Sequence, residues 1–345
     1  MRPKLSTGLL LGSVAATSLV LAGCASPGGS PAADGDLLQV VASTNVYGDI
    51  ASRVGGDLVE VTSIITGQTQ DPHSYEASAR DQLALAKADL VIENGGGYDS
   101  FIDTLLAGIG TSEPVVVNAS EESGLLDGDD VHAEDEGAAA DDHAEDEDAA
   151  ADDHAEDEGD HSADDDAHAH VEGFNEHVWF SFHAMENVAK ALADEFGELD
   201  PANEATYAEN YESFVSDVAA LEERSAELRI AADGGGVAVT EPVPVYLLEE
   251  IGLVNLTPDA FSEAFEAGAD VPPAALQETL ALFPAGSVTL LAYNEQTTGP
   301  ETEQVRGAAE DAGVAVVSFS ETMPEDGDYI GWMTDNLAAL SDALD

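Results

Sequence analysis

The feature that most constrains the fold is an alternation of short apolar runs with helical patterns in both halves of the chain. The runs are rich in Val, Ile and Leu, and segments with helical spacing of apolar residues follow them. Strands that are apolar on both faces are typical of a parallel sheet covered by helices on both sides. The predicted strands are residues 37–44, 58–65, 89–92 and 115–117 in the first half, and 237–240, 288–292 and 314–319 in the second. The pattern therefore predicts an α/β protein with two small parallel sheets.

A long helical pattern separates the two halves. It begins at Pro201, which suits a first helical turn, and it ends before the glycines at 234–236. A helix of about 30 residues is about 45 Å long, which is enough to cross from one lobe to another. We therefore expect an N-terminal lobe over 37–200, a connecting helix over 201–232 and a C-terminal lobe over 233–345.

An acidic tract over residues 127–170 interrupts the first lobe. It holds 21 of the 71 acidic residues and no Lys or Arg, and His132, His143 and His154 recur within it every 11 residues. Its few apolar side chains cannot build a core, so we expect a disordered loop. The whole chain has a net charge of −62. Such a charge repels nucleic acid and attracts cations, so we expect no nucleic-acid partner. We also expect a monomer.

The N-terminus has the pattern of an export signal. A basic start is followed by an apolar stretch over residues 8–21, which is too short for an ordinary spanning helix. The tetrad Leu21-Ala22-Gly23-Cys24 resembles the bacterial lipobox, in which the Cys is acylated. We therefore predict a signal peptide over 1–23, a lipid on Cys24 and a flexible tether over 24–36. This predicts a protein anchored by lipid at the extracytoplasmic face of the cell membrane. Cys24 is the only cysteine, so no disulfide is expected.

Four side chains are candidates for metal ligands. His73 lies in Asp71-Pro72-His73-Ser74-Tyr75-Glu76, and His177 lies in Asn175-Glu176-His177-Val178-Trp179-Phe180. Glu241 and Glu321 each follow a predicted strand. Because ligands of open parallel sheets bind beyond the carboxyl ends of the strands, His73, Glu241 and Glu321 are expected to face one cleft. Imidazole and carboxylate groups together predict a transition-metal site.

These motifs resemble those of the solute-binding proteins of bacterial zinc and manganese ABC importers, over nearly all the chain that follows the tether. The resemblance implies that His73, His177, Glu241 and Glu321 are the four ligands of a metal held in the cleft between the lobes. It also implies delivery of the metal to a permease in the membrane.

Two local patterns carry the resemblance into the second half. Glu241 stands before a helix with Tyr246 and then Gly252, as the third ligand of the family does. The fourth ligand is usually Asp and precedes a Tyr, Met and Asn pattern. Glu321 departs from Asp but precedes Tyr329, Met333 and Asn336.

The residues leave the metal open between zinc and manganese. Two imidazoles and two carboxylates bind Zn²⁺ tetrahedrally, whereas bidentate carboxylates suit Mn²⁺. By resemblance, Glu at the third position goes with manganese, but the His-rich tract favours zinc. We expect Zn²⁺, with Mn²⁺ as the alternative.

Two other classes of function are considered. A zinc hydrolase needs an open coordination position and a general base, but the sequence has neither an HExxH helix nor a nucleophile elbow, so no enzyme is expected. A surface adhesin or a metal buffer depends on the acidic tract and not on the cleft. Metal stoichiometry after deletion of residues 127–170 separates it from a receptor.

Overall fold

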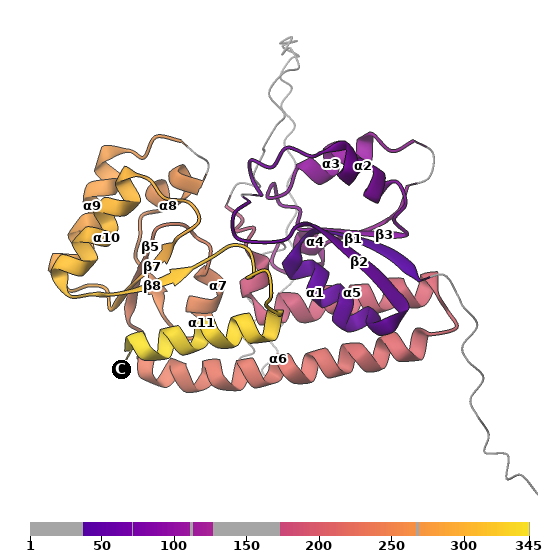
Figure 1. Ribbon diagram of the computed structural model, residues 1–345. Coiled ribbons are helices and arrows are strands. Elements are labelled where there is room, and N and C mark those ends of the chain that lie inside the picture. The colour runs from indigo at the N-terminus through magenta and orange to yellow at the C-terminus, as the bar shows by residue number, and fades with distance from the viewer. Residues whose placement is uncertain (1–36, 71, 111–112, 127–172, 267–268, 345) are drawn as a thin grey trace, which may run out of the picture. The chain divides into compact units, whose positions relative to one another are not determined.

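The computed structural model describes residues 37–70, 72–110, 113–126, 173–266 and 269–344 (Figure 1). The predicted signal peptide, the tether with Cys24, the acidic tract over 127–170 and Asp71 of the first histidine motif lie outside these residues. The described chain is an α/β protein with two lobes, and each lobe has a parallel sheet of four strands flanked by helices. The predicted fold class is therefore confirmed.

The first sheet has the strand order β2-β1-β3-β4. Its strands are β1 (Leu38–Thr44), β2 (Val59–Ile65), β3 (Leu90–Glu93) and β4 (Val115–Asn118). In the register of the sheet, Val40 lies between Val61 and Leu90. Val40 and Ala42 face one core whereas Val41 faces another, because side chains of a strand alternate between its two sides. Helices cover both faces: α1 (Asn45–Gly55), α2 (Ala79–Leu85), α3 (Phe101–Ala107), α4 (Ala119–Glu122) and α5 (Phe182–Leu199).

The second sheet repeats this plan with the order β6-β5-β7-β8. Its strands are β5 (Gly236–Val239), β6 (Val254–Asn255), β7 (Leu290–Asn294) and β8 (Ala315–Phe319). Its helices are α7 (Val245–Glu250), α8 (Asp259–Glu266), α9 (Pro273–Ala285), α10 (Pro300–Ala312) and α11 (Tyr329–Leu344). In both sheets the chain changes direction between the two middle strands, which is where ligand crevices form in open α/β sheets.

A single long helix, α6 (Glu204–Ala232), runs along both lobes (Figure 1). It packs against α1 and α5 of the first lobe and against α7 and α11 of the second. Its buried residues include Tyr207, Phe214, Leu221 and Leu228, which are spaced by two helical turns. Pro201 does not start the helix as predicted. It lies in a turn before it, in which the Asp200 carboxylate accepts hydrogen bonds from Asn203 (2.6 Å) and Tyr207 (3.1 Å).

The largest apolar core contains side chains from both sheets. Val40 and Val237 belong to it, as do residues of α1, α5, α6, α7 and α11. Two smaller cores fill the opposite faces of the sheets. One lies under α2 and α3 of the first lobe, and the other under α8, α9 and α10 of the second. The shared core ties the lobes together on the side of the sheets that faces α6.

Five short elements lie outside the predicted pattern. They are two 3₁₀ turns (Gly56–Leu58 and Val178–Phe180), α4, β6 and α8. The two 3₁₀ turns, α4 and β6 have too few residues for a helical or strand period to emerge. The helix α8 is longer than the predicted α7, so its length does not explain why the pattern misses it. None of the helices in the described part of the chain combines the length and the apolar character that crossing a bilayer requires.

Candidate metal centre

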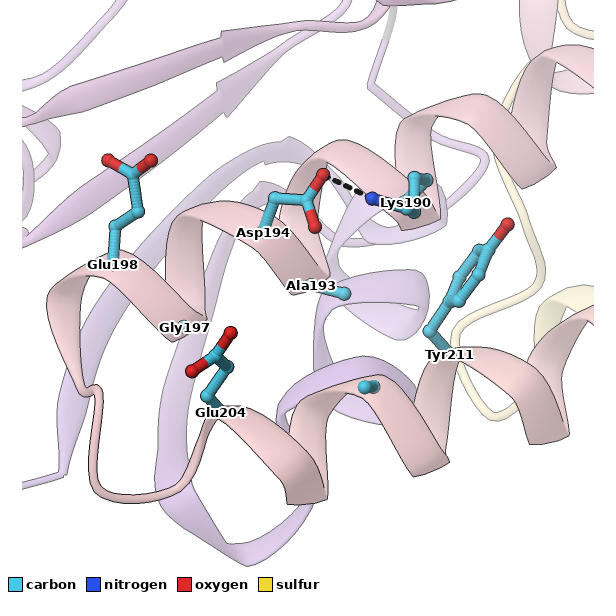
Figure 2. Close-up of a pocket in the computed structure, with 8 residues that line it drawn as sticks. Lys190, Ala193, Asp194, Gly197, Glu198, Glu204 and Tyr211 are labelled. Carbon is cyan, nitrogen blue, oxygen red and sulfur yellow. Dashed lines mark hydrogen bonds and ion pairs between the residues drawn. The ribbon is translucent and has the colours of Figure 1, made fainter.

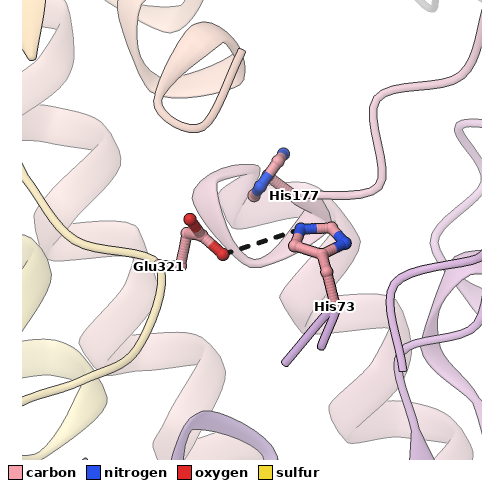
Figure 3. Close-up of side chains that lie close together, drawn as sticks. All are labelled: His73, His177 and Glu321. Atoms are coloured by element: carbon pink, nitrogen blue, oxygen red, sulfur yellow. Dashed lines mark ion pairs between the residues drawn. The ribbon is translucent and has the colours of Figure 1, made fainter. Parts of the chain in front are cut away.

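Three of the four predicted ligands lie close together. One ligand atom each from His73, His177 and Glu321 falls within 4.8 Å of the other two (Figure 3). His73 Nε2 is 3.7 Å from Glu321 Oε2. The side chains of His177 and Glu321 are buried, and that of His73 is 19% exposed. The group joins both lobes, because His73 and His177 come from the first and Glu321 from the second.

His73 lies in the loop that follows β2, next to the buried Pro72. Its ring packs edge-on against Tyr98, with 4.8 Å between ring centroids. A glycine turn after β3 places Tyr98 there: Gly95, at φ 71°, packs so close to the side chain of Asn118 that a Cβ would overlap it. The turn therefore needs glycine for its backbone conformation and for space.

Asn175 orients His177. The Asn175 side-chain oxygen lies 2.8 Å from His177 Nδ1 and accepts the His177 backbone N–H at 3.1 Å. The Asn175 amide nitrogen donates to the carbonyl of Pro242 in the second lobe, at 3.0 Å. Because the oxygen of an amide can only accept, Nδ1 of a neutral His177 carries the proton and Nε2 has the lone pair. Nε2 is the atom that a metal ion would use.

Two tyrosines of the second lobe hold the chain on either side of His177. Tyr246 donates to the carbonyl of Asn175 and Tyr329 to that of Trp179, at 2.8 and 2.9 Å. Burial raises the pKa of both phenols far above the ordinary value. Both hydroxyls therefore stay protonated at neutral pH and act as donors. These are the tyrosines of the two family patterns in the second half of the sequence.

Glu241 and Glu321 follow β5 and β8 and are each 3% exposed. A single side chain links them: the amide nitrogen of Asn294 lies 2.8 Å from Glu241 Oε2 and 2.7 Å from Glu321 Oε1. Glu241 is not part of the group within 4.8 Å. The structure thus places Glu241 beside Glu321, the fourth predicted ligand, on the other side of the Asn294 side-chain amide.

Gln296 links the loop of Glu321 to the first lobe. Its side-chain oxygen accepts the backbone N–H groups of Glu321 (2.5 Å) and Thr322 (3.1 Å). Its amide nitrogen donates to the carbonyl of Gln68, in the loop that leads to His73, at 2.9 Å. The Gln68 side chain donates to Ser320 at 2.8 Å. Polar contacts therefore cross between the lobes directly beside the candidate ligands.

Sequence reasoning missed the supporting residues Tyr98, Asn175, Asn294 and Gln296. Asn175 lies inside the second histidine motif, two positions before the ligand. Asn294 is the last residue of β7, and Glu241 and Glu321 follow their strands in a similar way. The expectation that ligands bind at the carboxyl ends of parallel strands therefore applies to Asn294 as well. For Tyr98 and Gln296 no sequence signal is evident.

A hollow of about 450 Å³ lies between α5 and α6 (Figure 2). Its rim carries Asp194, Glu198 and Glu204, with Lys190 paired to Asp194. None of the four predicted ligands lines it. The hollow is therefore separate from the candidate metal centre.

Comparison with known families gives one match over almost the whole described chain. The model of the family described as "Zinc-uptake complex component A periplasmic" matches residues 40–343. Among curated relatives, the manganese ABC transporter substrate-binding lipoprotein scaA of Streptococcus gordonii is 26% identical over 213 residues. That match covers 60% of this chain and 56% of the relative. The zinc-binding lipoprotein AdcA of Streptococcus pneumoniae serotype 4 is 24% identical over 346 residues, which cover 98% of this chain and 60% of AdcA.

Solved structures share the fold. The periplasmic zinc binding protein TroA from Treponema pallidum aligns with a TM-score of 0.65 and 18% identity, over 89% of this chain and 99% of that one. A mutant of the laminin-binding adhesin Lmb from Streptococcus agalactiae aligns with a TM-score of 0.65 and 20% identity, over 89% and 100%.

Proposed function

This chain belongs to the family of periplasmic zinc-uptake complex component A proteins, and from that premise we propose that it is an extracytoplasmic receptor for a divalent metal ion. The receptor delivers the ion to an ABC-type importer. Its curated relatives are named as substrate-binding or metal-binding lipoproteins, although the chain spans little more than half the length of the first of them.

One observation carries the proposal. Ligand atoms of His73, His177 and Glu321 converge from both lobes to within 4.8 Å of one another. We assign these three residues and Glu241 as the metal ligands. Two imidazole nitrogens and two carboxylate oxygens are a donor set that Zn²⁺ accepts in tetrahedral geometry. Four protein ligands leave no open position for a substrate water, so we propose a binding protein and not an enzyme.

We propose zinc as the physiological metal, with manganese as the alternative. Imidazole ligands favour Zn²⁺ over Mn²⁺, and the histidines of the acidic tract add the same preference. The manganese alternative has its own support, because relatives named for manganese are among the matches. Elemental analysis of protein purified from its own host, followed by competition between the two ions, decides between them.

Replacement of His73 or His177 by Ala tests the ligand assignment. Each change removes one of four ligands, and we expect metal affinity at the tightest site to fall by about two orders of magnitude or more while the fold persists. Isothermal titration of metal-free protein measures the affinity, and circular dichroism checks the fold.

His183→Ala is the matched control, because His183 lies exposed on α5. It should leave the tight site unchanged. Wild-type affinity in His73→Ala or His177→Ala would exclude that residue as a ligand.

We also propose that the receptor is held at the membrane by lipid on Cys24. The lipobox pattern supports this, as do the lipoprotein names of the relatives. Acyl chains on one residue would then supply the anchor after the signal is removed. In the native host, Cys24→Ser should move the protein from the membrane fraction to the soluble fraction, and retention of the processed variant in the membrane would refute the lipid anchor.

A further inference from the structure

Asn294 is the last residue of β7, and its side chain touches both candidate carboxylate ligands. The side chain is buried, with 2% exposure. Its amide nitrogen donates one hydrogen bond to Glu241 Oε2 (2.8 Å) and one to Glu321 Oε1 (2.7 Å). An amide nitrogen has two hydrogens, so the two carboxylates account for both of its strong bonds. A longer contact of 3.4 Å reaches the hydroxyl of Thr297.

The surroundings fix the orientation of this amide. The Asn294 side-chain oxygen accepts the backbone N–H of Gln296 at 3.0 Å, which an amide nitrogen in its place could not do. The Asn294 backbone N–H donates to the hydroxyl of Thr240 at 2.9 Å, directly before Glu241 in the chain. The donor end of Asn294 therefore points at the carboxylates in a position that the ends of β5 and β7 determine.

The contact engages one oxygen of each carboxylate. For Glu321 the oxygen held by Asn294 is Oε1, whereas Oε2 is the one 3.7 Å from His73 Nε2. For Glu241 the held oxygen is Oε2. A hydrogen bond from a fixed donor orients a carboxylate, so that its other oxygen is the one turned toward a metal.

We propose that Asn294 is a specificity-determining residue that keeps Glu241 and Glu321 monodentate. The inference rests on the proposed function, in which these residues and two histidines hold the ion. Two nitrogens and two single oxygens make four ligands, which suits tetrahedral Zn²⁺. Mn²⁺ prefers more oxygen ligands, and Asn294 withholds the two additional oxygens that bidentate carboxylates would provide.

The test compares the zinc and manganese affinities of the full chain with those of the Asn294→Ala and Asn294→Ser variants. Both variants remove the amide that donates to the two carboxylates, and Ser keeps a shorter group with a single hydroxyl donor. We expect the ratio of zinc affinity to manganese affinity to fall by about tenfold, the lower end of what outer-shell partners of metal ligands contribute. Asn210→Ala is the matched control: it loses a hydrogen bond from an Asn side chain to the carbonyl of Val54 and touches no candidate ligand. Its ratio should equal that of the wild type.

A spectroscopic measurement on the wild type keeps the inference testable even if both variants unfold. With Co²⁺ as the probe, the protein should show the intense visible bands of four-coordinate cobalt, and folded Asn294 variants should shift toward the weak bands of higher coordination. Weak bands in the wild type would overturn the inference, as would an unchanged zinc-to-manganese ratio in a folded variant. Failure of the wild type to bind zinc, manganese or cobalt tightly would instead refute the proposed function.

Discussion

Among single residues, the energetic cost of burying charge is clearest at two carboxyl groups of the first lobe. Glu93 ends β3, and Asp99 follows the glycine turn after it. Desolvation by burial raises the pKa of Glu93 to about 7, with a further increase from the nearby charge of Asp99. Burial likewise raises the pKa of Asp99 to about 6, although backbone N–H groups of Asn94 and Gly95 oppose the shift. Neither residue is a candidate ligand, so their effect should appear in stability.

The sign of that effect follows from proton linkage. The ordinary pKa of a Glu side chain is 4.5, so between about 4.5 and about 7 the native state holds a proton on Glu93 that the unfolded state has released. This contribution therefore lowers the free energy of unfolding as pH rises through the window, by at most about 1.4 kcal/mol per pH unit. We expect Glu93→Gln to be more stable than the wild type at pH values above the window and to lose this advantage below it.

Denaturant unfolding of metal-free protein at several pH values measures the difference. Gln keeps the oxygen that accepts a hydrogen bond from Asn118 at 2.9 Å, so the fold should tolerate it. Glu310→Gln removes an exposed carboxylate from α10 and should show no such pH-dependent gain. A stability difference for Glu93→Gln that is the same at every pH would contradict the prediction.

The sequence predicts candidate ligands but not the residues that orient them. His73 and His177 stand in motifs of their own, and Glu241 and Glu321 follow buried strands, where a carboxylate is costly unless it is paired. The role of Asn294 depends on two carboxylates that meet only in the folded chain. The expectation that ligands bind at the carboxyl ends of the strands points to Asn294, but an Asn at the end of a strand also suits a turn, so its position does not show that it contacts the carboxylates.

At the level of elements, the 3₁₀ turn over Val178–Phe180 determines where His177 points. His177 directly precedes this turn, and tyrosines of α7 and α11 bond the carbonyl of Asn175 before His177 and that of Trp179 after it. The second lobe thus contributes to the geometry of a ligand that belongs to the first.

Tyr246→Phe tests this arrangement. The change removes the hydroxyl that bonds the carbonyl of Asn175, and Asn175 in turn orients the His177 ring. We expect metal affinity to fall by about tenfold, the scale of second-shell partners of metal ligands. Calorimetric titration measures the loss, and thermal unfolding of metal-free protein shows whether the fold is retained.

Tyr211→Phe is the comparison, because this tyrosine of α6 contacts none of the candidate ligands in the described structure. It should bind metal as the wild type does. If Tyr246→Phe also binds as tightly as the wild type, the hydroxyl does not position His177.

The predictability of the elements follows from their burial and length. Strands such as β1 and β7 have apolar residues on both faces, and buried residues recur at helical spacing along α6. Both kinds of element can therefore be predicted from the sequence. The strand β6 has two residues, and its Val254 is 52% exposed, so no pattern marks it. The helix α6 starts later than the sequence predicts. Although Pro201 suits a first helical turn, it lies in a turn where Asn203 donates a hydrogen bond to Asp200.

At the level of the whole molecule, the tight metal site should be independent of the acidic tract. All four candidate ligands lie outside residues 127–170. We therefore expect deletion of this tract to leave one high-affinity site and to reduce the total number of metal ions bound, because a sequence with so few apolar side chains is expected to bind metal weakly. Zinc titration of the full chain and of the deletion variant gives both numbers.

A second variant separates the histidines of the tract from its carboxylates. It replaces six histidines by Asn and keeps every acidic residue: His132, His143, His154, His161, His168 and His170. The same drop in stoichiometry as in the deletion would assign the weak sites to imidazole. Loss of the tight site in either variant would instead place a true ligand in the tract and refute the four-residue assignment.

Gln296 also has a mechanical consequence. Its side chain forms hydrogen bonds both to the loop that leads to His73 and to the backbone of Glu321. Any movement that separates the lobes would have to stretch or break these hydrogen bonds, which lie in the loops of two candidate ligands. If the proposed receptor opens to release its ion, the opening would therefore disturb the candidate metal site directly, because the same hydrogen bonds join the lobes and position the loops of His73 and Glu321.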